Sequence, residues 1–238
     1  MFNKINYYFL DNLIYYFTPL LLNFLNIQFE IKYKTKKFSK FIISNHISEF
    51  DVFILYYIFK LNDINYRFVG DERLKNLPFV GNWGIEQNAI FISRVKDGCK
   101  QLIKKVKPND NIMIFPEGTL YYKPMIIKSN QICEQNNLDK YKYVLCPKIN
   151  GFNTIIDIIK PMEITDVTLI YHYKNKKYLS NSNKPLTIVN LMSNPPYKIT
   201  VIIKNIIVSN CSNINKDFVN IIFRKKDKLI KKILDCNN

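Results

Sequence analysis

The chain has 238 residues, 47% of them apolar, which is enough for one large domain with a sizeable core. Its 35 basic and 19 acidic residues give a net charge of +16, which suits nucleic acid, an anionic membrane or an anionic substrate. No zinc-finger or RNA-binding spacing accompanies the charge, so we expect no nucleic-acid partner. The five cysteines form no C-x-x-C pair, which disfavours a disulfide scaffold and a metal site.

The first element is an apolar segment between Asp11 and Glu30, where the 18 residues NLIYYFTPLLLNFLNIQF carry no charge. This length is a little short of the roughly 20 residues that span a bilayer, and Pro19, Asn23 and Asn26 weaken a spanning helix. The segment is typical of a marginal transmembrane helix or of a bent helix in the membrane interface. A buried amphipathic helix of the domain itself is the remaining alternative.

A run of lysines follows the apolar segment: Lys32, Lys34, Lys36, Lys37 and Lys40. By the positive-inside rule it would leave the rest of the chain in the cytosol, and it could contact anionic headgroups. We therefore divide the chain into residues 1–39, a membrane-associating segment with a basic linker, and residues 40–238, the main domain. We expect the protein to be membrane-associated, with this domain facing the cytosol.

Short apolar runs alternate with helical patterns over the first 160 residues. Strands are predicted at 40–45, 66–70, 89–93, 111–116, 142–147, 167–173 and 199–209, and helices at 49–59, 98–106, 129–138 and 217–234. Residues 178–198 are polar, contain prolines and are predicted to be a loop. The apolar strands lack clean alternation, which is typical of strands covered on both faces. We predict an α/β fold with a largely parallel central sheet of about seven strands flanked by helices, after an apolar N-terminal helical segment.

His46 and Asp51 lie where the strand at 40–45 gives way to a helix, the place where α/β sheets bind ligands. Five residues turn a helix by about 140°, so the two side chains meet only if His46 precedes the helix and Asp51 lies in its first turn. Ser48 and Asp51 have the spacing of a capping box with Ser48 as N-cap, which supports that geometry. The same spacing supports an alternative in which Asp51 only caps the helix and His46 is an ordinary loop histidine.

A neutral imidazole can take a proton from a substrate hydroxyl near neutral pH, and a carboxylate on its other nitrogen fixes the tautomer. No G-x-S-x-G elbow is present, so the base would act directly on a bound hydroxyl. Two further strands end on residues suited to anions, Arg94 and the turn Glu117-Gly118-Thr119. Because the carboxyl ends of parallel strands share one edge of a sheet, we expect these groups to lie together.

The ordered motifs resemble those of the lysophospholipid and glycerophosphate acyltransferase family. The four blocks are N-H-x-x-x-x-D at 45–51, I-F-I-S-R at 90–94, F-P-E-G-T at 115–119 and V-L-C-P at 144–147. The stretches 72–83, 140–156, 164–171 and 218–233 are similar to the lysocardiolipin acyltransferase branch. The resemblance covers roughly residues 40–234.

The resemblance implies that residues 40–238 are an acyltransferase domain. Such a domain would move a fatty acyl group from acyl-CoA to a free hydroxyl of a lysophospholipid, lysophosphatidate or a relative, without a covalent acyl-enzyme. Carried over by position, the catalytic residues would be His46 as base and Asp51 as its orienting carboxylate. Arg94, together with the turn Glu117-Gly118-Thr119, would hold the acceptor's phosphate, and within this turn we expect Glu117 to accept a hydroxyl or a backbone N–H. Acyl-CoA is then a co-substrate and the membrane surface a partner, with no bound cofactor, no metal and no obligate protein partner.

The chain departs from the family at Leu120, where many members carry arginine after E-G-T, unless Lys123 or Lys148 supplies the cation. The other histidine, His172, lies outside every block and is read as a strand or loop residue. Two alternatives stay open. One is a CoA-independent transacylase that uses a phospholipid donor at the same site, and the other is a non-catalytic lipid-binding protein with a decayed site.

Overall fold

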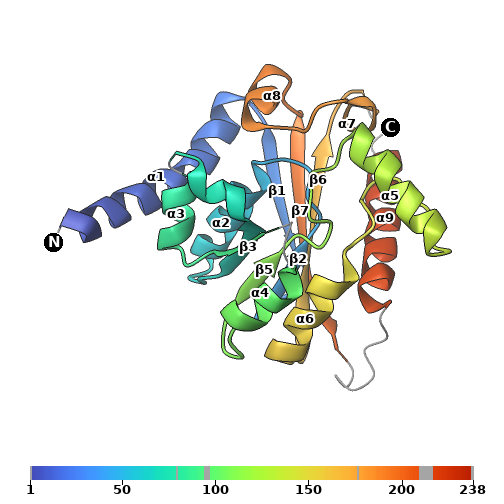
Figure 1. Cartoon of the computed structure of the whole chain (residues 1–238). Coiled ribbons are helices and arrows are strands. Elements are labelled where there is room, and N and C mark those ends of the chain that lie inside the picture. The colour runs from blue at the N-terminus through green and yellow to red at the C-terminus, as the bar shows by residue number, and fades with distance from the viewer. Residues whose placement is uncertain (1, 79, 94–96, 176, 209–216, 237–238) are drawn as a thin grey trace.

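The computed structural model describes residues 2–78, 80–93, 97–175, 177–208 and 217–236 (Figure 1). Within these residues seven strands form one sheet in the order β1-β7-β6-β2-β5-β3-β4. The strands are β1 (Gln28–Tyr33), β2 (Phe41–Ser44), β3 (Arg67–Asp71), β4 (Ile90–Ile92), β5 (Ile112–Ile114), β6 (Glu163–His172) and β7 (Lys198–Ile207). Every neighbouring pair is parallel except β6 and β7. The predicted α/β fold with a mostly parallel sheet is confirmed.

Helices cover both faces of the sheet (Figure 1). One face carries α1 (Phe2–Phe24), α2 (Asp51–Leu61) and α3 (Val80–Glu86), and the other carries α4 (Gly98–Lys105), α5 (Lys123–Gln135), α6 (Ile149–Ile159) and α9 (Phe218–Cys236). Three short helices complete the described chain: η1 (Glu72–Asn76), α7 (Tyr178–Asn181) and α8 (Ile188–Ser193). The last two lie within the segment that the sequence predicted to be a loop.

The central strands divide their side chains between two cores. In β2, Ile42 belongs to the core beneath α1 and α2, whereas Phe41 and Ile43 belong to the core beneath α6 and α9. Met113 of β5 repeats this arrangement between two isoleucines. Because both faces are buried, alternate positions are all apolar, which explains the unbroken apolar runs in the sequence.

Two strand predictions were wrong. Residues 142–147 form no strand, because Asp227 Oδ1 accepts the backbone N–H groups of residues 142, 143 and 144 at 3.0, 2.6 and 3.2 Å. Conversely, Gln28–Tyr33, which spans the end of the predicted apolar segment and the start of the basic linker, forms β1 at the edge of the sheet. Its alternation of Phe29 and Ile31 with Glu30 and Lys32 is the pattern of a half-exposed edge strand.

Helix α1 packs on the domain. Three of its apolar side chains belong to the core that also contains α2 residues: Ile14, Leu21 and Leu22. The buried Asp11 carboxylate pairs with Lys60 Nζ at 2.7 Å, accepts a hydrogen bond from Gln87 Nε2 at 2.7 Å and accepts another from the Tyr56 hydroxyl. None of the helices in the described part of the chain combines the length and apolarity needed to cross a bilayer.

The register of the sheet fixes what lies at each of its ends. Strands β2, β5 and β6 end at one edge, here called the carboxyl edge, and β7 and β1 begin there because they run in the opposite direction. The end of α1, which leads directly into β1, therefore lies at the carboxyl edge. The lysine run after Tyr33 connects the end of β1 to the start of β2, so it lies toward the opposite edge.

Candidate active site

The site begins where β2 ends. Asn45 is buried, and its side chain extends the pairing of β2 with β6: Oδ1 accepts the N–H of Leu169 and Nδ2 donates to its carbonyl, both at 2.9 Å. These two bonds take the place of the backbone hydrogen bonds between β2 and β6 for one residue beyond the end of β2. They fix the point at which the chain leaves the sheet, so His46 follows at the carboxyl edge.

His46 and Asp51 are in contact. Nδ1 of His46 lies 3.0 Å from Oδ2 of Asp51, and the imidazole stacks on the ring of Phe115 with centroids 3.8 Å apart. The Asp51 side chain is fully buried, whereas that of His46 is 17% exposed. A carboxylate accepts but does not donate, so it selects the tautomer with the proton on Nδ1 and leaves the lone pair on Nε2.

The Asp51 carboxylate is fixed by three further donors. Oδ2 accepts the backbone N–H groups of Ile47 at 2.6 Å and Ser48 at 2.9 Å, and Oδ1 accepts the hydroxyl of Tyr171 at 2.7 Å. With four donors on two oxygens the carboxylate cannot rotate without breaking hydrogen bonds. The imidazole is therefore held by a rigid acceptor.

The N-cap prediction for Ser48 was wrong. Helix α2 begins at Asp51 with Phe50 as N-cap, because the Ser48 hydroxyl accepts the Phe50 N–H at 3.1 Å and donates to the Leu186 carbonyl at 2.8 Å. Asp51 nevertheless reaches back to the chain before the helix, as the acidic residue of a capping box does. The capping interpretation and the base-orienting interpretation of Asp51 are therefore both consistent with one geometry.

The turn after β5, the strand beside β2, supplies the second part of the site. Gly118 has a φ of +66°, a left-handed conformation that glycine adopts without strain, and its N–H donates to the Phe115 carbonyl at 2.9 Å. Thr119 follows and is half-buried. The turn thus brings Phe115, Glu117, Gly118 and Thr119 to the carboxyl edge beside His46.

Glu117 joins two segments that are far apart in sequence. Oε2 accepts the backbone N–H of His46 at 2.7 Å and Oε1 accepts that of Leu145 at 2.9 Å, and the residue is only 3% exposed. Burial raises the pKa of Glu117 to about 8, while the two N–H groups and Lys226 oppose that rise. Because both oxygens accept backbone N–H groups, Glu117 supports the backbone of His46 and of Leu145, and the place of its turn in a phosphate site stays a prediction.

A buried ion pair lies among these elements and was missed by the sequence analysis. Lys226 Nζ is 2.7 Å from Asp166 Oδ1, both side chains are fully buried, and Lys226 also donates to the carbonyl of Val167, which faces Ser44 in the ladder. Burial lowers the pKa of Lys226 and the Asp166 carboxylate opposes this. The available signal was a lysine at a position of α9 flanked by buried Phe223 and Ile230 at helical spacing.

Two residues singled out in the sequence do not take part in this arrangement of described residues. Arg94 lies outside the described residues. His172 is buried in β6, where its Nε2 is 3.0 Å from Thr200 Oγ1, and burial lowers its pKa to about 4. It belongs to the sheet and does not contact His46. In the described part of the chain, no group of three or more His, Cys, Asp or Glu residues could hold a metal ion.

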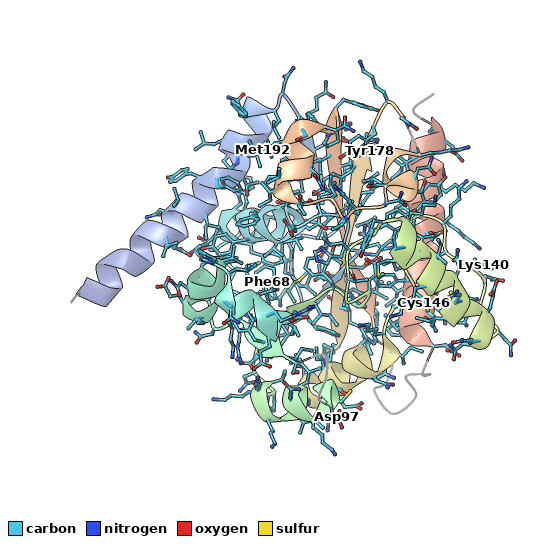
Figure 2. All side chains as sticks on the ribbon, turned by 45° about the horizontal axis from the view of Figure 1, so that its top comes forward. Phe68, Asp97, Lys140, Cys146, Tyr178 and Met192 are labelled. Atoms are coloured by element: carbon cyan, nitrogen blue, oxygen red, sulfur yellow. The ribbon has the colours of Figure 1, made fainter. Side chains whose placement is uncertain are left out.

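A cavity of about 320 Å³ adjoins the loop that carries His46. Tyr121 and Leu186 line it, and the Tyr121 N–H donates to the His46 carbonyl at 2.9 Å while the Leu186 carbonyl accepts the Ser48 hydroxyl. Tyr178, labelled in Figure 2, lines the same cavity from the start of α7. Two of the cavity's walls are therefore hydrogen-bonded to the loop that carries the imidazole.

Comparison with known proteins agrees with this arrangement. A family model described as Acyltransferase matches residues 26–171. Lysocardiolipin acyltransferase 1 of Gallus gallus is 31% identical over 127 residues, covering 47% of this chain and 33% of that protein. Its counterpart in Danio rerio is 27% identical over 148 residues, covering 55% and 37%. Lysophosphatidylinositol acyltransferase 10 of Caenorhabditis elegans is 30% identical over 113 residues, covering 42% and 29%. The chain thus spans about a third of the length of these curated relatives.

The fold has a counterpart among solved structures. The crystal structure of the 1-acyl-sn-glycerophosphate (LPA) acyltransferase PlsC from Thermotoga maritima aligns with a TM-score of 0.59 at 16% identity, over 95% of this chain and 82% of that chain. At this identity the likeness concerns the fold. Family membership rests on the family model, whose match includes β1, the His46 loop, the turn after β5 and the residues up to Tyr171. The chain belongs to the Acyltransferase family, and the curated relatives that it resembles include lysocardiolipin acyltransferases, as the sequence motifs predicted.

Proposed function

We propose that this protein is an acyl-CoA-dependent O-acyltransferase that transfers a fatty acyl group to a free hydroxyl of a lysophospholipid such as lysophosphatidate. The observation that carries the proposal is the 3.0 Å contact between His46 Nδ1 and the buried Asp51 carboxylate at the carboxyl edge of the sheet. A fixed carboxylate behind a partly exposed imidazole is the arrangement required of a general base. The names of the curated relatives support lysophospholipids as the acceptor class.

The proposed reaction uses His46 twice. Nε2 takes the proton of the acceptor hydroxyl while the oxygen attacks the thioester carbonyl of acyl-CoA. The C–S bond then breaks as the tetrahedral intermediate collapses, and the imidazolium returns the proton to the departing thiolate. Asp51 stabilises the positive charge on the imidazole between these steps, and a base placed in this way contributes about 10²- to 10⁴-fold in rate.

Phosphate binding by Arg94 and by the turn at Gly118 and Thr119 is part of the same proposal. The left-handed glycine keeps the turn compact, and Thr119 has a hydroxyl that can donate to a phosphate oxygen. A guanidinium binds phosphate through two parallel hydrogen bonds, which gives Arg94 its proposed role.

Membrane association is proposed through the outer face of α1. Four of its large apolar side chains are exposed and recur at helical spacing: Leu13, Tyr16, Leu20 and Phe24. The last of them, Phe24, is 75% exposed near the carboxyl edge, so this face of α1 and the site can meet the same bilayer. The catalytic domain would then work on the cytosolic side of the membrane.

Vesicle co-sedimentation tests the membrane contact. Leu20→Ser with Phe24→Ser is expected to reduce binding to vesicles of phosphatidylcholine and phosphatidate, because it removes apolar surface from the outer face of α1. Ile127→Ser is the matched control, since Ile127 is an exposed apolar residue on α5, on the other face of the sheet. Equal binding of all three proteins would refute the contact.

The function is tested by supplying labelled acyl-CoA with a panel of lysophospholipids and identifying the lipid product. The expected result is an acylated lysophospholipid together with free CoA, and loss of both in His46→Ala protein whose circular dichroism and unfolding midpoint match the wild type. Transfer by His46→Ala at the wild-type rate would refute the mechanism. Replacing acyl-CoA by a labelled diacyl phospholipid identifies a transacylase, and absence of product with every donor and acceptor identifies a protein without this activity.

A further inference from the structure

Helix α8 carries apolar side chains that the fold leaves uncovered. Leu191 is fully buried and attaches the helix to the core beneath α1 and α2, whereas Val189 is 70% exposed and Met192, labelled in Figure 2, is 47% exposed. Val189 and Met192 are three positions apart and therefore lie on the same side of the helix. Tyr197, which follows α8, is also exposed. The chain between β6 and β7 thus presents three large apolar side chains to the solvent.

These side chains lie near the end of α1. The Tyr197 N–H donates to the carbonyl of His172 at the end of β6 at 3.0 Å, and the Tyr197 carbonyl accepts the N–H of Gln28 at the start of β1 at 3.1 Å. A cavity of about 410 Å³ is lined both by residues that follow α1, such as Leu25, and by residues that follow α8, such as Pro195. Figure 1 accordingly shows α8 beside the upper end of α1. The exposed side chains of α8 therefore continue the exposed apolar face of α1 at the carboxyl edge.

The same part of the chain is basic. Residues 173–197 contain no Asp or Glu, and Lys174, Lys177 and Lys184 are exposed. Lys174 lines the cavity at the end of α1, and Lys184 lines the cavity that adjoins the His46 loop. The lysines are therefore distributed from the end of α1 to the loop that carries the imidazole.

Two carboxylates of neighbouring elements contact this part of the chain, and both have partners there. Glu49 accepts the Ile188 N–H at 3.2 Å, and Glu30 pairs with Lys198 at 2.8 Å. The surface around α8 therefore keeps a net positive charge. The lysine run after Tyr33, by contrast, lies toward the opposite edge of the sheet and does not add to this surface.

Apolar and cationic side chains on one surface fit the headgroup region of an anionic bilayer. Aliphatic and aromatic side chains enter the boundary between headgroups and acyl chains, and lysines beside them attract anionic headgroups. A small soluble anion would use the lysines and leave the apolar side chains in water. The acceptor that we propose for this protein is a lysophospholipid, which resides in such a bilayer.

We propose that a surface around α8 docks on an anionic phospholipid bilayer. This α8 surface consists of Lys174, Lys177, Lys184, Val189, Met192 and Tyr197. It adds a charged contact to the apolar contact proposed for α1, so that membrane binding becomes selective for anionic lipids. The Leu186 carbonyl accepts the Ser48 hydroxyl at 2.8 Å and the Glu49 N–H at 3.2 Å, which joins the α8 surface to the His46 loop. The consequence for catalysis rests on the proposed function: docking holds that loop at the membrane surface.

The charged part is tested by co-sedimentation with vesicles of phosphatidylcholine alone and of phosphatidylcholine with phosphatidate. Each lysine near an anionic surface strengthens binding by about fivefold at low salt. A triple Lys→Gln variant at positions 174, 177 and 184 should therefore bind phosphatidate vesicles about 100-fold more weakly, with a flatter salt dependence, and bind neutral vesicles as wild type does. The matched control is a triple Lys→Gln variant at positions 34, 36 and 37, which are exposed lysines toward the opposite edge of the sheet.

The apolar part is tested with the same vesicles. Val189→Ser with Met192→Ser should weaken binding to both kinds of vesicle by about 10-fold, because it removes apolar surface from the contact. Ile127→Ser with Ile132→Ser is the matched control, since both isoleucines are exposed on α5, on the other face of the sheet. All variants should keep the circular dichroism of the wild type, because every altered side chain is exposed.

Three results would overturn the inference. One is wild-type binding by both α8-surface variants. Another is an equal loss of phosphatidate binding in the control triple variant, which would mean that net charge alone drives binding. The last is a wild-type dimer in size-exclusion chromatography that Val189→Ser with Met192→Ser converts to a monomer, since the surface would then bind a second copy of the chain.

Acyl transfer separates failure of the inference from failure of the proposed function. With substrates in vesicles at low lipid concentration, Val189→Ser with Met192→Ser should lower the rate by about 10-fold, and with short-chain substrates dissolved as monomers it should leave the rate unchanged. An equal loss with both kinds of substrate would overturn docking as the cause. If the wild type transfers no acyl group, the proposed function fails and vesicle binding still decides the docking. If the wild type is active and the α8-surface variants bind vesicles as it does, only the inference fails.

Discussion

Replacing Asp51 by asparagine separates the two roles that its carboxylate combines, helix capping and orientation of His46. Asparagine is as good a capping residue as aspartate and has nearly the same shape. Because Oδ2 accepts the N–H groups of Ile47 and Ser48, the asparagine oxygen should take this position and still accept from His46 Nδ1. The amide nitrogen then faces the Tyr171 hydroxyl, which can accept from it. The substitution should therefore remove the charge and preserve the geometry.

The expected magnitudes follow from this count. Three hydrogen bonds on Oδ2 change from charged to neutral, each losing about 1 kcal/mol, so the free energy of unfolding should fall by about 3 kcal/mol. For catalysis the tautomer of His46 is retained, but the imidazolium formed during proton transfer loses its carboxylate. We expect kcat to fall by about 10²- to 10³-fold, with a smaller change in KM for the acceptor.

The assay pairs urea unfolding with acyl transfer to lysophosphatidate on the same preparation. Asp110→Asn is the matched control, because Asp110 also accepts a backbone N–H, that of Lys107 at 2.8 Å, and forms an ion pair with Arg67. Asp110 lies just before β5 and therefore toward the edge of the sheet opposite the carboxyl edge. It should lose stability and keep kcat. If Asp51→Asn lost the expected stability but kept kcat within about threefold of wild type, Asp51 would be a helix cap alone and the base mechanism would be wrong.

Three further predictions concern the supports of the site. Glu117→Ala leaves the backbone N–H groups of His46 and Leu145 without an acceptor, so the free energy of unfolding in urea titrations should fall by about 2–4 kcal/mol, and kcat should fall with it. Unchanged stability would refute the role of Glu117 in joining these two segments. Lys226→Met leaves Asp166 buried without its nearest cation and should lower the free energy of unfolding by about 3–5 kcal/mol. The double variant Lys226→Met, Asp166→Asn should recover part of this loss, and an equal or larger loss in the double variant would argue against the ion pair. His172 has its pKa lowered from 6.5 to about 4, so the unfolded chain binds more protons below pH 6.5 and stability should be lost as the pH falls from 6.5 to 4. His172→Gln should flatten that part of the stability curve, and parallel curves would refute the assignment.

The sheet was largely predictable because its inner strands are buried on both faces. Runs such as FII in β2 and IMI in β5 are apolar at every position and are only three residues long, which is typical of strands covered on both faces. The sequence of β1, QFEIKY, has only two buried-face residues among charges and continues into a lysine run, so local pattern favoured a linker. Residues 142–147 look like a strand because most of their side chains are apolar, but the N–H groups of residues 142–144 bond to Asp227, about 80 positions away. No local pattern contains that information.

The site was predictable as far as spacing determines it. The five-residue separation of His46 and Asp51 anticipated their contact across the start of a helix, and the left-handed conformation of Gly118 follows from its turn sequence. The part played by Tyr171, Glu117 and Lys226 depends on hydrogen bonds between segments more than 50 residues apart. The phosphate contact of Arg94 stays a prediction.

Two consecutive side chains of helix α9 bind different parts of the molecule. Lys226 donates a hydrogen bond to the Val167 carbonyl in the sheet. Asp227 accepts the Tyr143 N–H, two residues before the Leu145 N–H that donates to Glu117. This gives assembly a temporal order. On the ribosome the segments 45–51 and 115–119 emerge well before residue 218, and the helix that braces them emerges later. The His46 loop and the turn after β5 can therefore reach the arrangement described above only after α9 has been synthesised and has packed on the sheet.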